Sequence, residues 1–172
     1  MNKLTIVING KGGVGKDTLC LSLTDRRVRN VSSITPIKEI ASQHGWNGEK
    51  DLKSRRFLAE LKRVFTEYND LPNRYLVEQY REFLEGDEDI LFVHIREADQ
   101  IKAFVQGVHG DCITLLVRRD LPETAQGYGN RADDDVENYP YDVIFDNNHP
   151  LEQSTVAFSK LIDELLHTKL SQ

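Results

Sequence analysis

Four glycines and a lysine stand close together near the start of the chain, where an apolar segment, Leu4–Asn9, runs into a helical pattern. Glycine lets the backbone adopt positive φ angles and bring successive N–H groups against phosphate oxygens. The start of the following helix adds partial positive charge, and Lys16 can reach the β- and γ-phosphates. The spacing Gly10-x-x-x-x-Gly15-Lys16 therefore predicts a nucleoside triphosphate site. Its candidate residues are Gly10, Lys11, Gly12, Gly13, Val14, Gly15, Lys16, Asp17 and Thr18.

The residue after Lys16 departs from the usual pattern, because Asp17 stands where a Ser or Thr commonly ligates Mg²⁺. A carboxylate can hold Mg²⁺ directly or through water, so Asp17 is a candidate metal ligand. Without a metal it would repel a triphosphate. An acid is also favourable in the first turn of a helix for purely structural reasons. Both interpretations of Asp17 stay open at this stage.

A second group of charges points to an acceptor site. Residues 50–63 contain six basic and two acidic side chains, a local net charge of +4 in a chain whose net charge is −6. Guanidinium groups bind phosphate bidentately, so Arg55 and Arg56 are the predicted ligands of an acceptor phosphate. Lys38, in the helix predicted after the second strand, has a similar acceptor-side position. For each of these residues, a solvated basic helix face is the structural alternative.

Two further candidates directly follow an apolar run, Ile90–Ile95. Ligands of open α/β sheets bind at the carboxyl ends of the strands. Arg96 is therefore a candidate to bridge donor and acceptor phosphates, and Glu97 to orient Mg²⁺ or the attacking oxygen. Asp89 precedes the same strand, about 20 Å from the phosphates at ~3.3 Å per residue, and is excluded as a metal ligand. His94, inside the apolar run, is expected to be a packed, hydrogen-bonded residue.

A long polar segment at about 118–139 separates the last two predicted strands. So long an irregular stretch in a compact domain is usually functional or disordered, and we expect a mobile lid. Arg118, Arg119 and Arg131 bracket the segment and could close onto the phosphates. Arg131 is the predicted catalytic arginine, and Arg118 is a donor-side candidate. The acidic run at 133–135 favours a solvated turn.

Strand-like and helix-like segments alternate along the chain, which predicts an α/β sheet with helices on both faces. We find no internal repeat, so residues 1–172 are predicted to form one domain, with acceptor-binding helices at about 36–85. The predicted strands are 4–9, 31–34, 90–95, 112–117 and 141–146. The predicted helices are 16–29, 36–45, 51–68, 72–85, 97–106 and 151–167.

Composition narrows the classes of partner. Hydrophobic residues make up 39% and charged residues 29% of the chain, as in ordinary soluble globular proteins. A net charge of −6 argues against a surface built for nucleic acid polymers or anionic membranes. No apolar run approaches the ~20 residues of a membrane span, and the first residues predict a strand and loop rather than a signal peptide. Cys20 and Cys112 are expected to be buried thiols. We therefore expect a cytoplasmic protein.

The order of these features resembles that of the P-loop nucleoside monophosphate kinases, especially the deoxynucleoside monophosphate kinase branch that includes animal-type phosphomevalonate kinases. The likeness is carried by Gly15-Lys16-Asp17-Thr18, Pro36-Ile-Lys-Glu, the basic helix at 50–62, His94-Ile-Arg96-Glu97, and Tyr141-Asp142-Val143-Ile144.

This resemblance implies a three-layer α/β/α fold with a five-stranded parallel sheet ordered 2-3-1-4-5. It also implies transfer of a phosphoryl group from ATP, with Mg²⁺, to a small phosphorylated acceptor. The related branch likewise carries Asp after the loop lysine. In related kinases the segment after the last strand holds the adenine ring. Asn147 is therefore a donor-side candidate whose amide could read a base edge or simply make the turn.

A second resemblance competes with the first. Lys11-Gly-Gly-Val-Gly-Lys16 is similar to the loop of partitioning and nitrogenase-iron-protein ATPases, in which Lys11 would reach the nucleotide of a second subunit. Those ATPases carry Thr-Thr after the second lysine and a later Asp-x-x-Gly switch, and this sequence has neither. A non-catalytic nucleotide-binding regulator and a kinase for a non-nucleotide acceptor such as phosphomevalonate also stay open. So do GTP as the donor and a homodimeric state.

Overall fold

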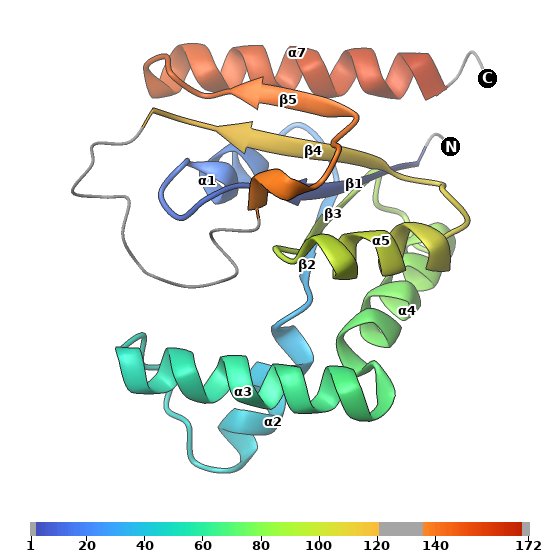
Figure 1. The fold of residues 1–172 in the computed structure, drawn as a ribbon. Coiled ribbons are helices and arrows are strands. Elements are labelled where there is room, and N and C mark those ends of the chain that lie inside the picture. Colours follow the sequence, from blue (N-terminus) through green and yellow to red (C-terminus); the bar gives the residue numbers. More distant parts are fainter. Residues whose placement is uncertain (1–2, 121–135, 170–172) are drawn as a thin grey trace.

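The computed structural model describes residues 3–120 and 136–169 (Figure 1). Five strands form one sheet in the order β2-β3-β1-β4-β5, and every pairing is parallel. This confirms the expected fold class and strand order. The strands are β1 (Leu4–Asn9), β2 (Val28–Ser32), β3 (Ile90–His94), β4 (Ile113–Arg118) and β5 (Val143–Asp146). The helices are α1 (Lys16–Leu21), α2 (Thr35–Gln43), α3 (Leu52–Asn69), α4 (Leu71–Glu85), α5 (Ala98–Gly107), the 3₁₀ turn η2 (Val136–Asn138) and α7 (Leu151–Lys169).

Successive side chains of a strand point to opposite faces of the sheet, so both faces carry apolar side chains. Different helices cover the two faces. On one face, β1 packs against α1 and α7 through Ile6, Ile8, Leu19, Phe158 and Ile162. On the other face, the sheet packs against α4 and α5 through Val7, Val93, Leu76, Phe83 and Phe104. These two apolar layers give the three-layer arrangement seen in Figure 1, with α7 along one side and α4 and α5 on the other. No described helix is both long enough and apolar enough to cross a membrane.

The three helices between β2 and β3 match the prediction closely. Apolar spacing predicted helices at 36–45, 51–68 and 72–85, and α2, α3 and α4 lie there. Asp51 caps α3 by accepting a hydrogen bond from the Ser54 backbone N–H at 2.7 Å. Asp70, with φ of 55°, joins α3 to α4 in a sharp turn. A small apolar cluster that includes Ile37 and Leu58 holds α2 on α3.

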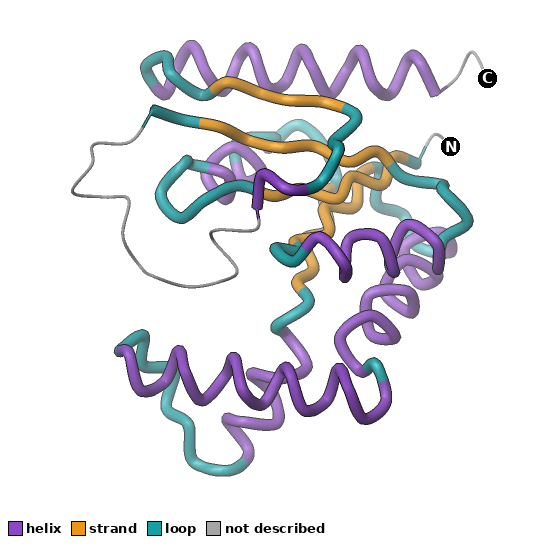
Figure 2. The backbone as a smooth tube through the Cα atoms, in the orientation of Figure 1, coloured by secondary structure: helices purple, strands orange, loops and turns teal. Residues whose placement is uncertain are grey.

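The region between the first two strands differs from the prediction. α1 ends at Leu21 rather than near residue 29, and β2 begins at Val28 rather than at residue 31, so both predicted ranges were wrong. The hydroxyl of Ser22 donates to the carbonyl of Leu19 at 2.7 Å, a local bond that competes with helix continuation. Val28 then pairs with Ile90 in the sheet. Figure 2 shows this short α1 directly after the loop that leaves β1.

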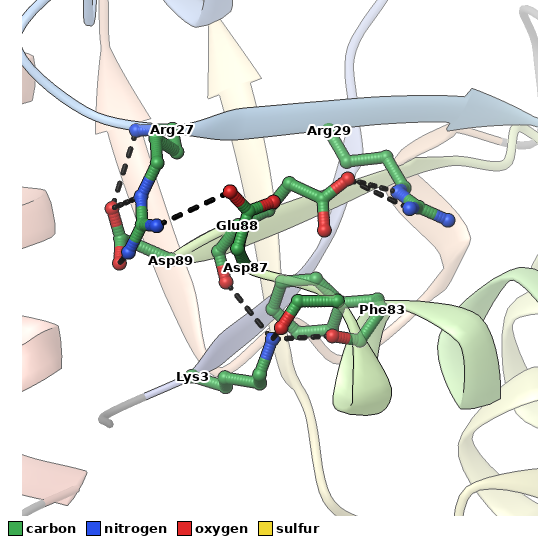
Figure 3. Close-up of polar contacts among 8 residues, drawn as sticks. Lys3, Arg27, Arg29, Phe83, Asp87, Glu88 and Asp89 are labelled. Carbon is green, nitrogen blue, oxygen red and sulfur yellow. Dashed lines mark hydrogen bonds and ion pairs between the residues drawn. The ribbon is translucent and has the colours of Figure 1, made fainter.

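The acidic turn at residues 85–89 lies at the amino end of β3, where basic side chains contact it (Figure 3). Arg29 contacts Glu88 at 2.7 Å and Arg27 contacts Asp89 at 2.8 Å. The ammonium of Lys3 donates to the carbonyl of Glu88 at 3.1 Å, among other backbone oxygens. Asp89 therefore has a structural partner, in keeping with its exclusion as a metal ligand.

Candidate functional site

The loop after β1 has a backbone that requires glycine at particular places. Gly13 and Gly15 have φ angles of 82° and 87°, in the left-handed region that other residues rarely adopt. A Cβ atom at Gly10 would lie 2.8 Å from the Val117 carbonyl oxygen and 2.7 Å from a methyl group of Val14. The loop therefore passes too close to β4 for any larger residue at position 10.

The same loop presents backbone donors. Within the described residues, no acceptor lies within hydrogen-bond distance of the N–H groups of Gly13, Gly15, Lys16 or Asp17. Val14 donates to the Lys11 carbonyl at 3.4 Å, which closes the turn. N–H groups without acceptors at the start of a helix suit the oxygens of a phosphate chain. The loop is therefore the candidate site for a triphosphate.

The ammonium of Lys16 has two partners at the mouth of the loop. It donates to Asp17 Oδ1 at 2.6 Å and contacts His94 Nδ1 at 3.3 Å. Because an ammonium only donates, Nδ1 is the acceptor and Nε2 carries the hydrogen, which goes to Asn30 Oδ1 at 3.0 Å. Burial and the charge of Lys16 lower the pKa of His94 to about 4, so its ring is neutral at physiological pH. His94 is hydrogen-bonded, as expected, but its contact with Lys16 was not predicted.

Asp17 is ionised and reachable from solvent. Burial raises its pKa, but the hydrogen bond from Lys16 and the charges of Lys16 and Arg96 outweigh this, so the pKa lies below its ordinary value. Its side chain is 78% exposed. No group of three or more His, Cys, Asp or Glu side chains in the described residues could hold a metal. A Mg²⁺ ion at Asp17 would therefore complete its shell with phosphate oxygens and water.

Among the predicted acceptor residues, the central contact is one that the sequence did not single out. The ammonium of Lys62 donates to both carboxylate oxygens of Glu97, at 2.9 and 2.8 Å, and to the hydroxyl of Ser33 at 2.9 Å. Lys62 is 8% exposed, a rare burial for lysine. These bonds join α3 to the ends of β2 and β3. In the sequence, Lys62 stands within the apolar stripe of an amphipathic helix, and this position could have indicated a buried lysine with an acidic partner.

The two predicted arginines of α3 lie on different faces of the helix. At 3.6 residues per turn, residues seven apart share a face, so Arg55, which is exposed, lies on the same face as Lys62, two turns earlier along the helix. Arg56 shares its face with Arg63 instead, which pairs with the exposed side chains of Glu60 and Glu67. Arg55 therefore lies on the helix face that carries the link to Glu97.

Other predicted donor-side residues lie around the loop. The Asn147 side chain is 5% exposed, and its amide donates to the Val14 carbonyl at 2.8 Å, so it braces the loop. Arg118 is exposed at the end of β4, and its carbonyl accepts from the Asn147 backbone N–H at 2.7 Å. Lys11 lies 3.8 Å from Glu137 of the same chain. Arg131 and most of the predicted lid lie outside the described residues.

Lys38 and the two cysteines stand apart from these contacts. Lys38 is an exposed residue of α2. The two cysteines, Cys20 and Cys112, are free, and burial raises the pKa of each to about 12. Their thiols therefore stay protonated; Cys20 is buried, as expected, whereas Cys112 is only partly buried.

Solved structures share this fold at low sequence identity. The tunicamycin resistance protein of Deinococcus radiodurans is 12% identical, with a TM-score of 0.57 over 93% of this chain and 95% of that chain. A sugar kinase from Janibacter is 15% identical, with a TM-score of 0.54 over 94% and 95%. TT1252 from Thermus thermophilus is 17% identical, with a TM-score of 0.56 over 96% and 99%. No protein-family model and no curated protein matches the sequence. The likeness establishes the fold, a five-stranded parallel sheet in the order 2-3-1-4-5 flanked by helices, and the sugar kinase is among the structures that share it.

Proposed function

We propose that this chain is a kinase that transfers the γ-phosphoryl group of ATP, with Mg²⁺, to a nucleoside or deoxynucleoside monophosphate. The observation that carries the proposal is the loop from Gly10 to Lys16, in which the N–H groups of Gly13, Gly15 and Lys16 have no acceptor among the described residues. The kinases among the structures of similar fold support the same class of reaction. Phosphoryl transfer depends on positioning and charge neutralisation more than on covalent chemistry, and this site offers both.

On the donor side, the ion pair at the mouth of the loop has to open. Lys16 turns from Asp17 toward the β- and γ-phosphate oxygens when the nucleotide binds. Asp17 is then available to Mg²⁺, which neutralises the developing charge when it is bound. His94 keeps its position beside Lys16, because its other nitrogen is held by Asn30 at 3.0 Å. Asn147, bonded to the loop carbonyl, is proposed to support the donor site rather than to select the base.

On the acceptor side, the charges favour a phosphorylated molecule over a simple alcohol. An alcohol needs a base to accept its proton. Both carboxylate oxygens of Glu97 already accept hydrogen bonds from Lys62, so this carboxylate is poorly placed to act as that base. A phosphate oxygen is already anionic and needs cationic ligands instead. We propose Arg55 and Arg96 as these ligands, with Lys38 as an additional contact. Arg131 is proposed as the arginine that stabilises the transferring charge.

The experiment is an ADP-release assay with ATP and Mg²⁺, run without acceptor, with each common nucleoside and deoxynucleoside monophosphate, and with phosphomevalonate. We expect ADP to form only when a nucleoside or deoxynucleoside monophosphate is present. Turnover with ATP alone would favour the ATPase switch, and turnover with phosphomevalonate alone would reassign the acceptor. Failure of titration calorimetry to detect binding of ATP or GTP would overturn the triphosphate site.

A further inference from the structure

Asn9, the last residue of β1, is fully buried and contacts three separate segments. Its Oδ1 accepts the backbone N–H of Gly10 at 2.8 Å. Its Nδ2 donates to the carbonyl of Arg96 at 3.0 Å and to the hydroxyl oxygen of Tyr141 at 2.8 Å. The phosphate loop, the turn after β3 and the segment before β5 therefore meet at one side chain.

The chemistry of the partners fixes the orientation of this amide. A backbone N–H only donates and a carbonyl only accepts, so Oδ1 must face Gly10 and Nδ2 must face Arg96. The Tyr141 hydroxyl donates a hydrogen bond to the Val136 carbonyl at 2.7 Å, so the hydroxyl oxygen accepts the hydrogen bond from Asn9 Nδ2. Nothing but an amide supplies one acceptor and two donors in this shape. The position thus demands asparagine for its hydrogen bonds, whereas an apolar residue would serve for packing alone.

We propose that Asn9 is a positioning residue, which fixes the distance between the phosphate loop and Arg96. The inference rests on the proposed function, in which Arg96 bridges the donor and acceptor phosphates. The Asn9 amide ties the Arg96 backbone to the first residue of the loop across the β1–β3 pairing. A shift of Arg96 would leave each substrate able to bind but would misplace the charge that meets both phosphates during transfer. Such displacements lower kcat more than they lower affinity.

The experiment distinguishes the acceptor role of the Asn9 Oδ1 from the donor role of its Nδ2. Asn9→Asp keeps the acceptor for the Gly10 N–H and loses the donors to Arg96 and Tyr141. We expect kcat to fall about 100-fold, while the Kd for ATP, measured by titration calorimetry, rises less than about 10-fold, because the loop contact remains although the new carboxylate repels the triphosphate. Thr5→Val is the matched control, since Thr5 is a buried polar residue of the same strand, 1% exposed, and pairs with Leu91 away from the site.

A second variant decides the matter if the buried carboxylate prevents folding. Tyr141→Phe removes one of the three partners, and we expect kcat to fall about 5-fold at unchanged ATP affinity. If the wild type shows no acceptor-dependent turnover, the proposed function fails and this inference falls with it. If the wild type turns over but the folded Asn9→Asp variant, or Tyr141→Phe in its place, behaves like Thr5→Val, the inference alone is overturned. Equal losses in ATP affinity and kcat would also overturn it, because they indicate a general structural defect.

Discussion

The ammonium of Lys16 is the single group on which the donor site depends most. Its partners, Asp17 at 2.6 Å and His94 at 3.3 Å, hold it at the mouth of the loop. We expect Lys16→Ala to lower kcat about 1,000-fold, or about 4 kcal/mol of transition-state stabilisation, in the ADP-release assay. Lys102→Ala, an exposed lysine of α5, is the control. Near-normal turnover of Lys16→Ala would reject the site.

The acceptor site can be tested by comparing two neighbouring arginines. Arg55 shares a helix face with Lys62, whereas Arg56 lies about 100° further around α3. Loss of a charge-assisted hydrogen bond to phosphate costs about 2 kcal/mol, so we expect Arg55→Ala to raise the KM for the acceptor about 30-fold. We expect Arg56→Ala to raise it less than about 3-fold, as for an exposed charge. Equal effects of the two variants would contradict this assignment of faces.

At the scale of the elements, one ion pair links α3 to the sheet. Lys62→Met leaves Glu97, whose side chain is 28% exposed, without its partner. A fully buried unpaired charge costs 3–5 kcal/mol, and partial solvation lowers this to about 2 kcal/mol of the free energy of unfolding. The double variant Lys62→Met/Glu97→Gln removes both charges and should recover most of that loss. Urea unfolding measures both changes, and unchanged stability of Lys62→Met would show that the pair does not hold α3.

At the scale of the whole molecule, the candidate site lies at the carboxyl ends of the strands, and the ionic contacts of Figure 3 lie at their amino ends. The hydrogen bond from Arg29 lowers the pKa of Glu88 below its ordinary value of 4.5. A lowered carboxyl pKa in the folded state stabilises the protein above the unfolded pKa, and this contribution disappears as the pH falls through the folded pKa. The ionic contacts at the amino ends of the strands should therefore affect the stability of the protein in acid without affecting the proposed reaction.

We expect Glu88→Gln to lower the free energy of unfolding by about 1 kcal/mol at pH 7 and to have a smaller effect near pH 3, because the contribution of the ionised carboxyl is lost as the pH falls below 4.5 and through the lowered folded pKa. Urea unfolding at the two pH values provides the measurement. Glu85→Gln, an exposed residue at the end of α4, is the control. A loss of stability that is the same at both pH values would show that the charge of Glu88 is not responsible, and kcat should be unchanged.

Local patterns in the amino-acid sequence were enough to predict the glycine-rich turn after β1, helices α3 and α4 and strands β1 and β3. Glycine spacing and apolar periodicity act over a few residues, so they can be recognised without knowledge of distant contacts. The same patterns misplaced the end of α1, because apolar residues in a short segment suit helix and strand alike. Pairing of Val28 with Ile90 resolved that ambiguity in the folded sheet.

The contacts that shape the candidate site arise from the folded chain. Asn9 meets the Arg96 carbonyl across 87 positions, Lys62 meets Glu97 across 35, and Asn147 meets the Val14 carbonyl across 133. None of these pairs leaves a periodic signal, since each is created by the order of strands in the sheet. The types of chemistry were readable from the residues, whereas the parallel sheet determined which side chains could act on one another.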